Sequence, residues 1–374
     1  MNDNATNKIL LSVAILTYNR AGCLKNLLNG LLPQAEKFKG EVEICISDNS
    51  SEDNTAEIVS KFKEKYPGLI NYNKNKENLG FDRNFLLAAE MSKGDFVWTF
   101  GDDDLMAENG LEEALDFIKK NKKEEIGLMF AKTESYFIDK KTGQKIIQSN
   151  SLDKNKPESF KINKEDIVSM SLPEISFISA LIFNNKFLKR LFKEDREIIE
   201  KAVGNLHIHM TLCALIFLKY PDINGFSLNK RPLIYQEIYL YKPLIESKFA
   251  VHYKEQKTLN NSLLSCGYMN DNYSSSIIKR DKKLRRGFII DMITMRAFKR
   301  FKYVSFFGCL KLFFQKAAFI DALLFSFVFL ILFLIPSKIL TSLYKILLII
   351  KYGKEWKIKW NFANQMSSSP ARAF

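Results

Sequence analysis

Three short apolar runs, each followed at once by a polar cluster, constrain the fold of this 374-residue chain more than any other feature. The runs span residues 9–16, 42–47 and 96–100 and are rich in branched and aromatic side chains. Such uninterrupted runs are typical of parallel strands buried on both faces. Helical patterns at 21–32 and from about 55 to 66 follow the first two runs. This alternation predicts an α/β fold, with a mostly parallel, doubly wound sheet flanked by helices.

The pattern continues along the chain. We expect Pro33 to end the first helix. A short strand at 70–73, helices at 81–92 and 108–120, and a strand at 126–132 follow. Residues 135–164 are polar and predict a surface hairpin and loop, and residues 230–241 predict a basic turn followed by an edge strand. We predict that residues 1–240 form one domain of two halves, 1–115 and 116–240.

Three consecutive carboxylates, Asp102, Asp103 and Asp104, follow the third apolar run directly. Adjacent acids repel one another unless a cation or a set of donors compensates them. Mg²⁺ or Mn²⁺ held by one or two carboxylates completes its shell with water and phosphate oxygens, which indicates a phosphorylated or nucleotide-linked substrate. The alternative interpretation is a solvated acidic turn before the next helix.

Polar clusters follow each of the three strands: Thr17 to Arg20, Asp48 with Asn49, and the acid triplet. Right-handed crossovers bring the carboxyl ends of parallel strands to one edge of the sheet, where α/β proteins bind ligands. We therefore expect one shared site there. The first strand-to-helix turn reads TYNRAG and lacks the GxGxxG fingerprint, which disfavours a dinucleotide-dependent dehydrogenase.

Charge is distributed unevenly along the chain, whose formal net charge is +14. Residues 1–239 contain 33 Lys and Arg against 35 Asp and Glu, whereas residues 240–374 contain 23 against 7. This last third is also strongly apolar, and the combination favours an anionic membrane surface as a partner. No nucleic-acid motif competes with it, so we expect no nucleic-acid partner.

The cysteines and the N-terminus bear on the cellular compartment. Five scattered cysteines without CxxC spacing suggest neither a disulfide framework nor a zinc site, and a reducing compartment fits best. The first residues, MNDNATNK, do not have the pattern of a secretory signal, so we expect none before the first strand.

The C-terminal region, residues 241–374, is predicted to be helical, basic and membrane-associating. Residues 279–286 read KRDKKLRR, and residues 296–316 mix aromatic side chains with Lys and Arg, as interfacial helices do. The uncharged run at 322–335 has 14 residues, short of the ~20 that a spanning helix needs. A shallow hairpin or monotopic insertion is therefore favoured over a true span. The soluble alternative is a set of core helices or a dimer interface.

Residues 10–113 resemble the nucleotide-sugar half of family 2 glycosyltransferases, which have the GT-A fold. The resemblance implies that residues 1–115 are the nucleotide-sugar half of the domain and residues 116–240 the acceptor half. Four motifs carry this resemblance in the family's order: TYNR, VEICISDNSSEDNT, NLGFDRN and the acid triplet. The runs ISDNSSEDNT, NLGFDRNF and WTFGDDD look most like the subgroup that includes abequosyltransferases, which add a dideoxyhexose to a lipid-linked O-antigen precursor. The sequence departs from the commonest pattern at Gly101, where the family's metal motif usually opens with an acid.

The resemblance implies roles for individual residues. The nucleotide-sugar donor would be bound by Thr17, Asn19, Arg20, Asp48, Asn78, Gly80, Arg83, Asn84 and Asp102. Within this set, Asp48 would accept a hydrogen bond from the base. Asp103 and Asp104 would hold the metal ion. The plain structural alternatives are that Thr17 and Asn19 cap the first helix and that Arg83 pairs with Asp82 or Glu90.

An inverting transfer needs a general base for the acceptor hydroxyl. Many family members place an acidic pair about a hundred residues after the metal motif, where this chain has GNLHIH at 204–209. His209 is the first candidate, because it matches a histidine of the abequosyltransferase-like subgroup, and His207 is the second; either can serve as a base or as an extra metal ligand. A capping or core histidine is the alternative.

Other residues are weaker candidates on the acceptor side. Glu194 and Asp195 form a reserve acidic pair, and Arg231 or Tyr235 would touch the diphosphate or the acceptor. Asp104 counts among the catalytic residues through the metal ion.

The sequence therefore predicts a hexosyl- or deoxyhexosyl-transferase that depends on Mn²⁺ or Mg²⁺. It would move a sugar from a nucleotide-diphosphate donor to a polyprenyl-diphosphate-linked saccharide in surface polysaccharide biosynthesis. We expect it at the cytoplasmic face of the inner membrane, with its oligomeric state open. One alternative is a catalytically inactive, membrane-docked scaffold of a polysaccharide assembly complex. Another is a nucleotidyltransferase, which normally carries a Gly- and Lys-rich first loop in place of TYNRAG.

Overall fold

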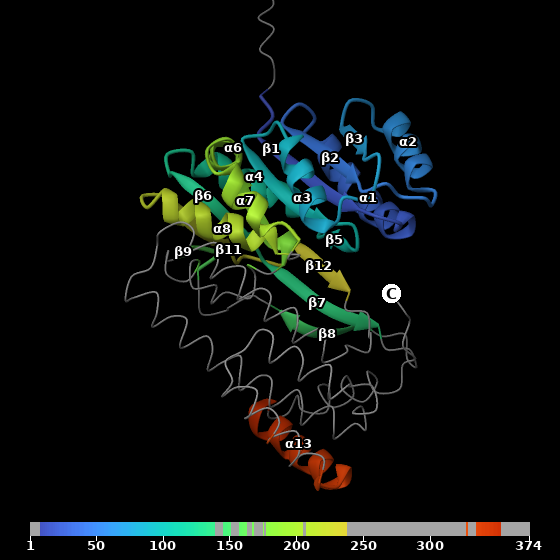
Figure 1. Ribbon diagram of the computed structural model, residues 1–374, viewed down its shortest axis with the longest axis vertical. Helices are drawn as coiled ribbons and strands as arrows, with labels where there is room; N and C mark the ends of the chain where they lie inside the picture. The colour runs from blue at the N-terminus through green and yellow to red at the C-terminus, as the bar shows by residue number, and fades with distance from the viewer. Residues whose placement is uncertain are drawn as a thin grey trace, which may run out of the picture. The chain divides into compact units, whose positions relative to one another are not determined.

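The computed structural model describes residues 8–138, 145–150, 157–162, 177–204, 207–237 and 334–352, together with Ile167, Ile175 and Phe327. The chain divides into two compact units, one of residues 1–238 with 258–269 and one of residues 239–257 with 270–374. The first unit holds the α/β fold (Figure 1). The division of residues 1–240 into donor and acceptor halves stays a prediction.

An eight-stranded sheet forms the centre of the first unit. Its spatial order is β3 (Ile70–Lys74), β2 (Val42–Asp48), β1 (Leu11–Thr17), β4 (Phe96–Gly101), β10 (Leu181–Asn184), β6 (Ile126–Ala131), β11 (Asn224–Leu228) and β9 (Ser159–Ile162). The first four strands are mutually parallel, as are β6 and β11, whereas β10 and β9 run antiparallel to their neighbours. The predicted α/β class and the largely parallel sheet are confirmed.

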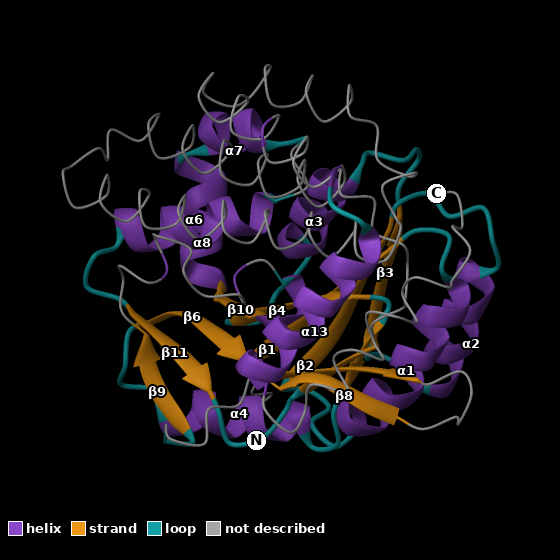
Figure 2. Cartoon of the chain, turned by 90° about the horizontal axis from the view of Figure 1, so that it is seen from below, coloured by secondary structure: helices purple, strands orange, loops and turns teal. Residues whose placement is uncertain are grey.

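Helices cover both faces of this sheet, which gives three layers (Figure 2). One face carries α1 (Ala21–Glu36), α2 (Thr55–Lys65) and α4 (Gly110–Lys120), and the other carries α3 (Phe81–Glu90), α6 (Asn185–Glu194), α7 (Arg196–Ala202) and α8 (Ile208–Lys219). Strands β1 and β4 are buried along their whole length. The expectation that uninterrupted apolar runs are covered on both sides is therefore correct.

The prediction that Pro33 ends the first helix is wrong, because α1 continues through it to Glu36. Two contacts explain the difference. Leu31, Leu32 and Ala35 are fully buried, so the last turn is held by core packing. The side chain of Gln34 donates to the carbonyl oxygens of Gly30 at 3.2 Å and Ala107 at 3.0 Å, and this helps to satisfy polar groups near the proline.

A second, smaller sheet stands beside the first. Its order is β5 (Asp104–Met106), β12 (Ile234–Glu237), β7 (Thr133–Ile138) and β8 (Lys145–Asn150). Strands β7 and β8 form the predicted hairpin. The prediction of an edge strand at β12 is wrong, since β12 pairs with β5 on one side and with β7 on the other. The sequence gives no sign of β5, because its first residue is the last of the three acids.

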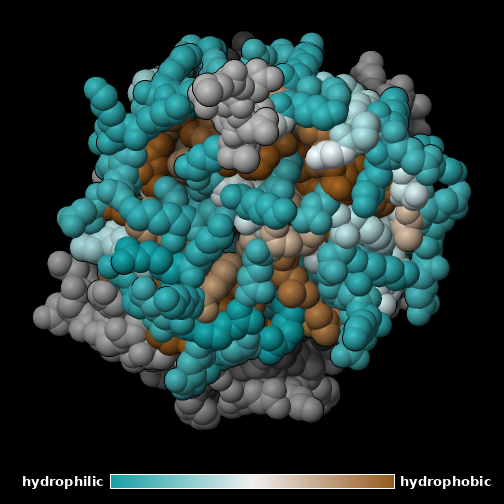
Figure 3. Space-filling view, turned by 90° about the horizontal axis from the view of Figure 1, so that it is seen from above, coloured by the Kyte–Doolittle hydropathy of each residue, from teal (hydrophilic) through white to brown (hydrophobic). Residues whose placement is uncertain are grey.

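The surface of the first unit is mostly polar on the face drawn in Figure 3, where apolar residues show only as separate streaks between hydrophilic ones. This fits a core that is closed by the two helical layers. Isolated exposed apolar side chains are ordinary on soluble domains.

In the second unit, the structure describes one helix, α13 (Ser337–Tyr352). Ile339, Leu343, Ile346 and Ile350 recur at helical spacing, and between 48% and 76% of each is exposed. No helix among the described residues is long and apolar enough to cross a membrane. The sequences at 279–286 and 296–316 lie outside the described residues, as does the run at 322–335 except for Phe327, Leu334 and Ile335.

Candidate active site

The polar clusters that follow β1, β2 and β4 meet at one edge of the large sheet, as expected. Thr17 at the end of β1 lies opposite Asp48 at the end of β2. On its other side, Leu16 of β1 lies opposite Gly101, the last residue of β4. This parallel register places the acid triplet beside Thr17. We call this edge the rim.

Asp102 connects the first and third clusters of the rim. Its carboxylate accepts a hydrogen bond from the Thr17 hydroxyl at 2.7 Å and from the Arg20 guanidinium at 3.2 Å. Arg20 also donates to Asp103 at 2.9 Å, so one cation lies between two acids. Asp102 is 3% exposed, whereas the side chain of Asp103 is 42% exposed. Thr17, Arg20, Asp102 and Asp103 are thus brought together.

Asp104 points to a different partner. Its Oδ2 accepts from the Ser179 hydroxyl at 2.5 Å, and the Ser179 oxygen in turn accepts from the Gly101 N–H at 2.9 Å. Ser179 is fully buried, in the short 3-10 turn Ile178–Ala180 that precedes β10. Sequence reasoning missed Ser179, because a serine between apolar residues carries no spacing signal.

The electrostatics of the triplet are unfavourable when no added cation is present. Burial, with repulsion from Asp103 as a further cause, raises the pKa of Asp104 to about 8. Burial also raises the pKa of Asp102 to about 6, although the hydrogen bond from Thr17 and the charge of Arg20 oppose this shift. Arg20 therefore neutralises part of the triplet only, and a second positive charge would relieve the rest.

Gly101 leaves space beside the carboxylates of Asp103 and Asp104. A Cβ atom built on this glycine would lie 3.1 Å from Oδ1 of Asp103 and 3.3 Å from Oδ2 of Asp104. Two carboxylate oxygens thus face one small region that any other residue would fill. In the described part of the chain, no group of three or more His, Cys, Asp or Glu side chains is placed to hold a metal ion. An ion held by Asp103 and Asp104 would complete its shell with water or with oxygens of a substrate.

Neutral side chains surround the cluster that follows β2. Asn84 of α3 is 3% exposed, and its Oδ1 accepts from the Ser47 hydroxyl at 2.7 Å and from Nδ2 of Asn75 at 3.0 Å. Its own Nδ2 donates to the Ser47 carbonyl at 3.0 Å. Asn84 therefore fastens α3 to β2, and we call these side chains, with Asn49 and Asn78, the asparagine network.

Asn49 and Asn78 extend this network to the start of α3. Nδ2 of Asn49 donates to Oδ1 of Asn78 at 2.7 Å, and Oδ1 of Asn49 accepts from the Leu79 N–H at 2.9 Å. Gly80 donates its own N–H to Asn78 at 2.9 Å and adopts a φ of +80°, which glycine tolerates best. The predicted donor residues Asn78, Gly80 and Asn84 thus belong to one connected structure.

Asp48 is fully buried and holds the second loop. Its carboxylate accepts from the Tyr72 hydroxyl at 2.7 Å and from the Ser51 N–H at 2.8 Å. Burial and this hydrogen bond raise the pKa of Tyr72. Sequence reasoning missed Tyr72, whose position in a short third strand gave no functional signal.

Asn19 ties the first loop to the second. Its N–H donates to Oγ of Ser51 at 2.9 Å, and its Oδ1 accepts from the Glu52 N–H at 2.7 Å. The first N–H of α1, from Ala21, donates to Asp53 at 2.9 Å. In this structure Asp53 therefore takes the capping role that the plain alternative gave to Thr17 and Asn19.

Arg83 lies away from the partners that the plain alternative suggested. Its guanidinium makes two hydrogen bonds with Glu200 of α7, at 3.2 and 2.6 Å, so the pairing with Asp82 or Glu90 is wrong. Glu90 pairs with Arg196 instead. These ion pairs connect the outer surface of α3 to α7.

The two candidate histidines lie against α3. His207 is 8% exposed and precedes α8, and His209, 2% exposed, lies in its first turn. The His209 ring is 6.2 Å from the Phe81 ring and 6.0 Å from the Phe85 ring, and the two imidazoles are 5.8 Å apart. The role of each histidine stays a prediction.

Three of the four remaining acceptor-side candidates are held in ion pairs. Asp195 is buried and pairs with Lys219 of α8, and Glu194 lies 3.9 Å from Arg190. Arg231 pairs with Glu113 at 3.0 Å. Tyr235 lies on β12 opposite Leu105, one residue beyond Asp104.

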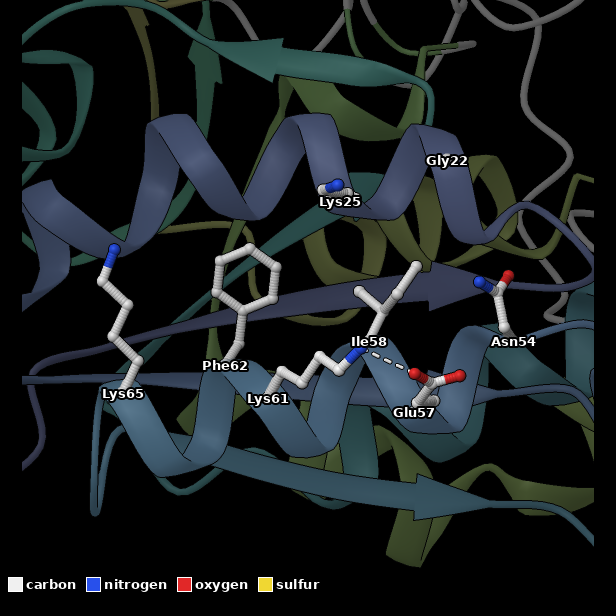
Figure 4. A pocket seen from close by; sticks show the side chains of 8 residues that line it. All are labelled: Gly22, Lys25, Asn54, Glu57, Ile58, Lys61, Phe62 and Lys65. Carbon is white, nitrogen blue, oxygen red and sulfur yellow. Dashed lines mark hydrogen bonds and ion pairs between the residues drawn. The ribbon is translucent and has the colours of Figure 1, made fainter.

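A shallow groove of about 440 Å³ runs between α1 and α2 (Figure 4). Ile58 and Phe62 are the apolar residues that line it. Its other lining residues are Gly22, Lys25, Asn54, Glu57, Lys61 and Lys65. All of these are exposed, and Lys61 pairs with Glu57 at 2.6 Å. None of the acid triplet lines this groove, so it is separate from the site described above.

Comparison with known proteins tests the family resemblance that the motifs carry. Residues 12–172 match the glycosyl transferase family 2. Over that region the chain is similar to this family, and the family resemblance drawn from its motifs is confirmed there.

Two characterised relatives align with the same part of the chain. The abequosyltransferase RfbV of Salmonella typhimurium is 46% identical over 103 residues, which cover 28% of this chain and 31% of the relative. The poly(ribitol-phosphate) beta-N-acetylglucosaminyltransferase TarP of Staphylococcus aureus is 33% identical over 114 residues, 30% of this chain and 33% of the relative. The aligned part of the chain thus spans about a third of the length of these relatives.

The fold has a counterpart among solved structures. The crystal structure of S. aureus TarS superposes with a TM-score of 0.50 at 18% identity, covering 75% of this chain and 44% of that one. At this identity the likeness concerns the fold alone. It extends beyond the region that the family match covers.

Proposed function

We propose that this protein is a metal-dependent glycosyltransferase that moves a sugar from a nucleotide-diphosphate donor to a saccharide acceptor in surface polysaccharide biosynthesis. The observation that carries the proposal is the rim itself. Thr17, Arg20 and the three acids converge at the carboxyl ends of β1 and β4, inside a family 2 glycosyltransferase region. The abequosyltransferase relative supports a hexosyl or deoxyhexosyl donor.

Asp103 and Asp104 fit a divalent ion. Their oxygens face the same space above Gly101, and the raised pKa of Asp104 indicates a carboxylate that lacks a full counter-charge. Mn²⁺ or Mg²⁺ bound here would neutralise the diphosphate leaving group. Asp102 orients Arg20, and Arg20 is thereby held at the rim with part of its guanidinium accessible to a phosphate.

The donor's nucleoside would lie on the β1–β2 side of the rim. Thr17 and Asn19 fix the first loop, Asp48 fixes the second, and the asparagine network fixes the start of α3. Because these polar side chains are already hydrogen-bonded to one another, the loops are organised before a donor binds. Such organisation lowers the conformational entropy that binding costs.

The acceptor would enter on the α3–α8 side. His209 is the proposed general base and His207 the second candidate, because both lie on the segment that packs against the start of α3. The base removes the proton of the acceptor hydroxyl as the hydroxyl oxygen attacks the anomeric carbon from the face opposite the leaving diphosphate. This geometry inverts the anomeric configuration.

A lipid-linked acceptor and attachment to the cytoplasmic face of the inner membrane complete the proposal. The support is the excess of 23 Lys and Arg over 7 Asp and Glu in residues 240–374, with the exposed apolar stripe of α13. Basic residues are attracted to anionic headgroups by about 1 kcal/mol each near the surface. Vesicle flotation with and without anionic lipid tests this part of the proposal separately.

Calorimetric titration with UDP, GDP, CDP and dTDP, each with and without Mn²⁺, tests the proposed activity. We expect one diphosphate to bind in a Mn²⁺-dependent manner, and we expect Asp103→Asn to weaken that binding by at least tenfold. Asp116→Asn, which changes an exposed carboxylate of α4, is the matched control and should bind normally. If no diphosphate binds under any condition, the scaffold alternative becomes the better account.

A further inference from the structure

Asp82 in the first turn of α3 is a buried acid that the proposed chemistry leaves unused. Only 2% of it is exposed. Its Oδ2 accepts from the Gly204 N–H at 2.7 Å, and its Oδ1 accepts from the Ile208 N–H at 3.2 Å. Both donors are main-chain groups more than a hundred positions further along the chain. One carboxylate therefore holds both ends of the segment 204–208.

This segment leads directly into the candidate base. His207 precedes α8, whose first residue is Ile208, and His209 follows. The N–H groups of a first helical turn have no partner within the helix and carry a partial positive charge. The carboxylate of Asp82, which belongs to α3, accepts the first N–H of α8. This contact ties the start of α8 to α3.

The same helix also contacts the imidazole. Phe81, next to Asp82, meets the His209 ring edge to face at 6.2 Å, and Phe85 lies 6.0 Å away one turn later. The backbone before His209 and the side chain of His209 are thus both set by the first two turns of α3.

A hydrogen-bonded route joins these contacts to the donor side of the rim. Asn49, directly after β2, holds Asn78 and the Leu79 N–H just before α3 begins. Asn84 fastens the next turn of α3 to Ser47 of β2. Asp82 lies between these two attachments, so its position is fixed relative to the carboxyl end of β2.

We infer that Asp82 is a positioning residue, through which the donor half of the site holds the histidine-bearing segment in place for the transfer. The inference rests on the proposed function, since it assigns Asp82 to the acceptor side of that reaction. Asp82 itself touches neither substrate. It sets the distance between the acceptor's base and a donor fixed at the rim, and small errors in that distance are costly to the rate.

Two ion pairs join α3 to α7, and they provide a comparison with the contacts of Asp82. Arg83 binds Glu200 and Glu90 binds Arg196, with all four side chains between 32% and 44% exposed. Exposed ion pairs contribute little to stability because water and salt screen them. Asp82 differs from them because it is buried and bonds the main chain.

The release of nucleotide diphosphate from the nucleotide sugar whose diphosphate binds in the calorimetric titration tests the inference. We would measure it for Asp82→Asn and Asp82→Ala in the 374-residue chain, with Arg196→Gln as the control. We expect Asp82→Ala to lower kcat at least 30-fold, while the affinity for the nucleotide diphosphate stays within twofold of the unmodified protein. Asp82→Asn keeps one acceptor oxygen and should recover part of the lost kcat. Arg196→Gln should leave kcat and donor affinity within twofold.

Hydrogen exchange supplies a readout that does not depend on catalysis. In Asp82→Ala, the amides of Gly204 and Ile208 should exchange at least tenfold faster, while those of β2 are unchanged. The inference is overturned if kcat is unaffected in both variants, or if kcat and donor affinity fall together with the melting temperature. Failure of the unmodified protein to bind any nucleotide diphosphate would contradict the proposed function instead, and the exchange result would still report on the contact.

Discussion

The asparagine network after β2 and the acid triplet after β4 lie on the same rim but differ in how completely they are satisfied. In the network, Asn49 and Asn84 bond to neighbouring side chains and to main-chain groups. In the triplet, burial raises the pKa of Asp102 and of Asp104 although Thr17, Arg20 and Ser179 contribute hydrogen bonds. The side chains of the network are paired with one another, whereas burial disfavours the ionised form of two acids of the triplet.

The two regions therefore have different tasks. Neutral hydrogen bonds in a closed network rigidify the loops that surround a ligand. Like charges that are held together under poor compensation create a site for a cation. Four experiments can break or sharpen this distinction. The first three each change one side of it, and the fourth changes neither.

The largest effect is expected from the network. Asn84→Ala should lower the free energy of unfolding by about 3 kcal/mol, because Ser47 and Asn75 lose their partner inside the protein. Urea unfolding followed by circular dichroism measures this change. Asn26→Ala, on the exposed surface of α1, is the control and should have little effect. A loss well below 1 kcal/mol at Asn84 would mean that the network does not hold α3.

Metal addition should have the next largest effect. Mn²⁺ at a hundred times its dissociation constant should stabilise the protein by about 2.7 kcal/mol relative to the protein in EDTA. Asp103→Asn should lose most of this gain, because one of the two oxygens above Gly101 would no longer carry charge. Unfolding curves with Mn²⁺ and with EDTA at pH 7.5 give both values. Equal curves for the unmodified protein would argue against a metal site.

The acid triplet should also make the metal-free protein less stable as pH rises. The native state keeps the proton of Asp104 up to a pKa of about 8, while the unfolded chain releases it near its ordinary pKa of about 4. The native state thus binds more protons between these values, and the free energy of unfolding falls through that window as pH increases.

Asp104→Asn removes this dependence, since the amide cannot ionise. In EDTA the variant should be more stable than the unmodified protein at pH 8, and the difference should shrink toward pH 5. Asp116→Asn, with an exposed carboxylate, controls for loss of charge alone. If the unmodified protein is the more stable one at pH 8, the acid triplet is not strained by charge.

The smallest expected effect tests whether the stability of the protein can change without a change in nucleotide binding at the rim. Gly22 lies in the first turn of α1, and a Cβ atom added there meets nothing within 4 Å. Gly22→Ala should stabilise the protein by about 0.5 kcal/mol through helix propensity and leave nucleotide binding unchanged. Thermal unfolding and calorimetry check the two parts. Weaker nucleotide binding in this variant would mean that the rim extends into the groove beside α1.

Much of the rim could be predicted from the sequence because it depends on local patterns. The ends of β1, β2 and β4 follow from apolar runs, and parallel pairing then brings Thr17, Asp48 and the acids together without further information. The helices that follow β1 and β2 were also correctly placed, apart from the continuation of α1 through Pro33.

The residues that were missed depend on contacts between distant parts of the chain. Ser179 reaches Asp104 across 75 positions, and Asp82 reaches Ile208 across 126. Strand β5 forms because β12 pairs with it, and no periodicity near residue 104 indicates this. Such contacts are set by tertiary packing, which a single sequence read locally does not contain.

The place of β10 in the large sheet has a consequence for how this region can be divided. The match to the family ends at residue 172, yet β10 at Leu181–Asn184 lies between β4 and β6 and joins the two halves of the sheet. The turn before it delivers Ser179 to Asp104. A fragment cut at the end of the homologous segment would expose the edges of two buried strands. The segment that matches the family is therefore smaller than the folded unit that could be expressed or transferred to another protein on its own.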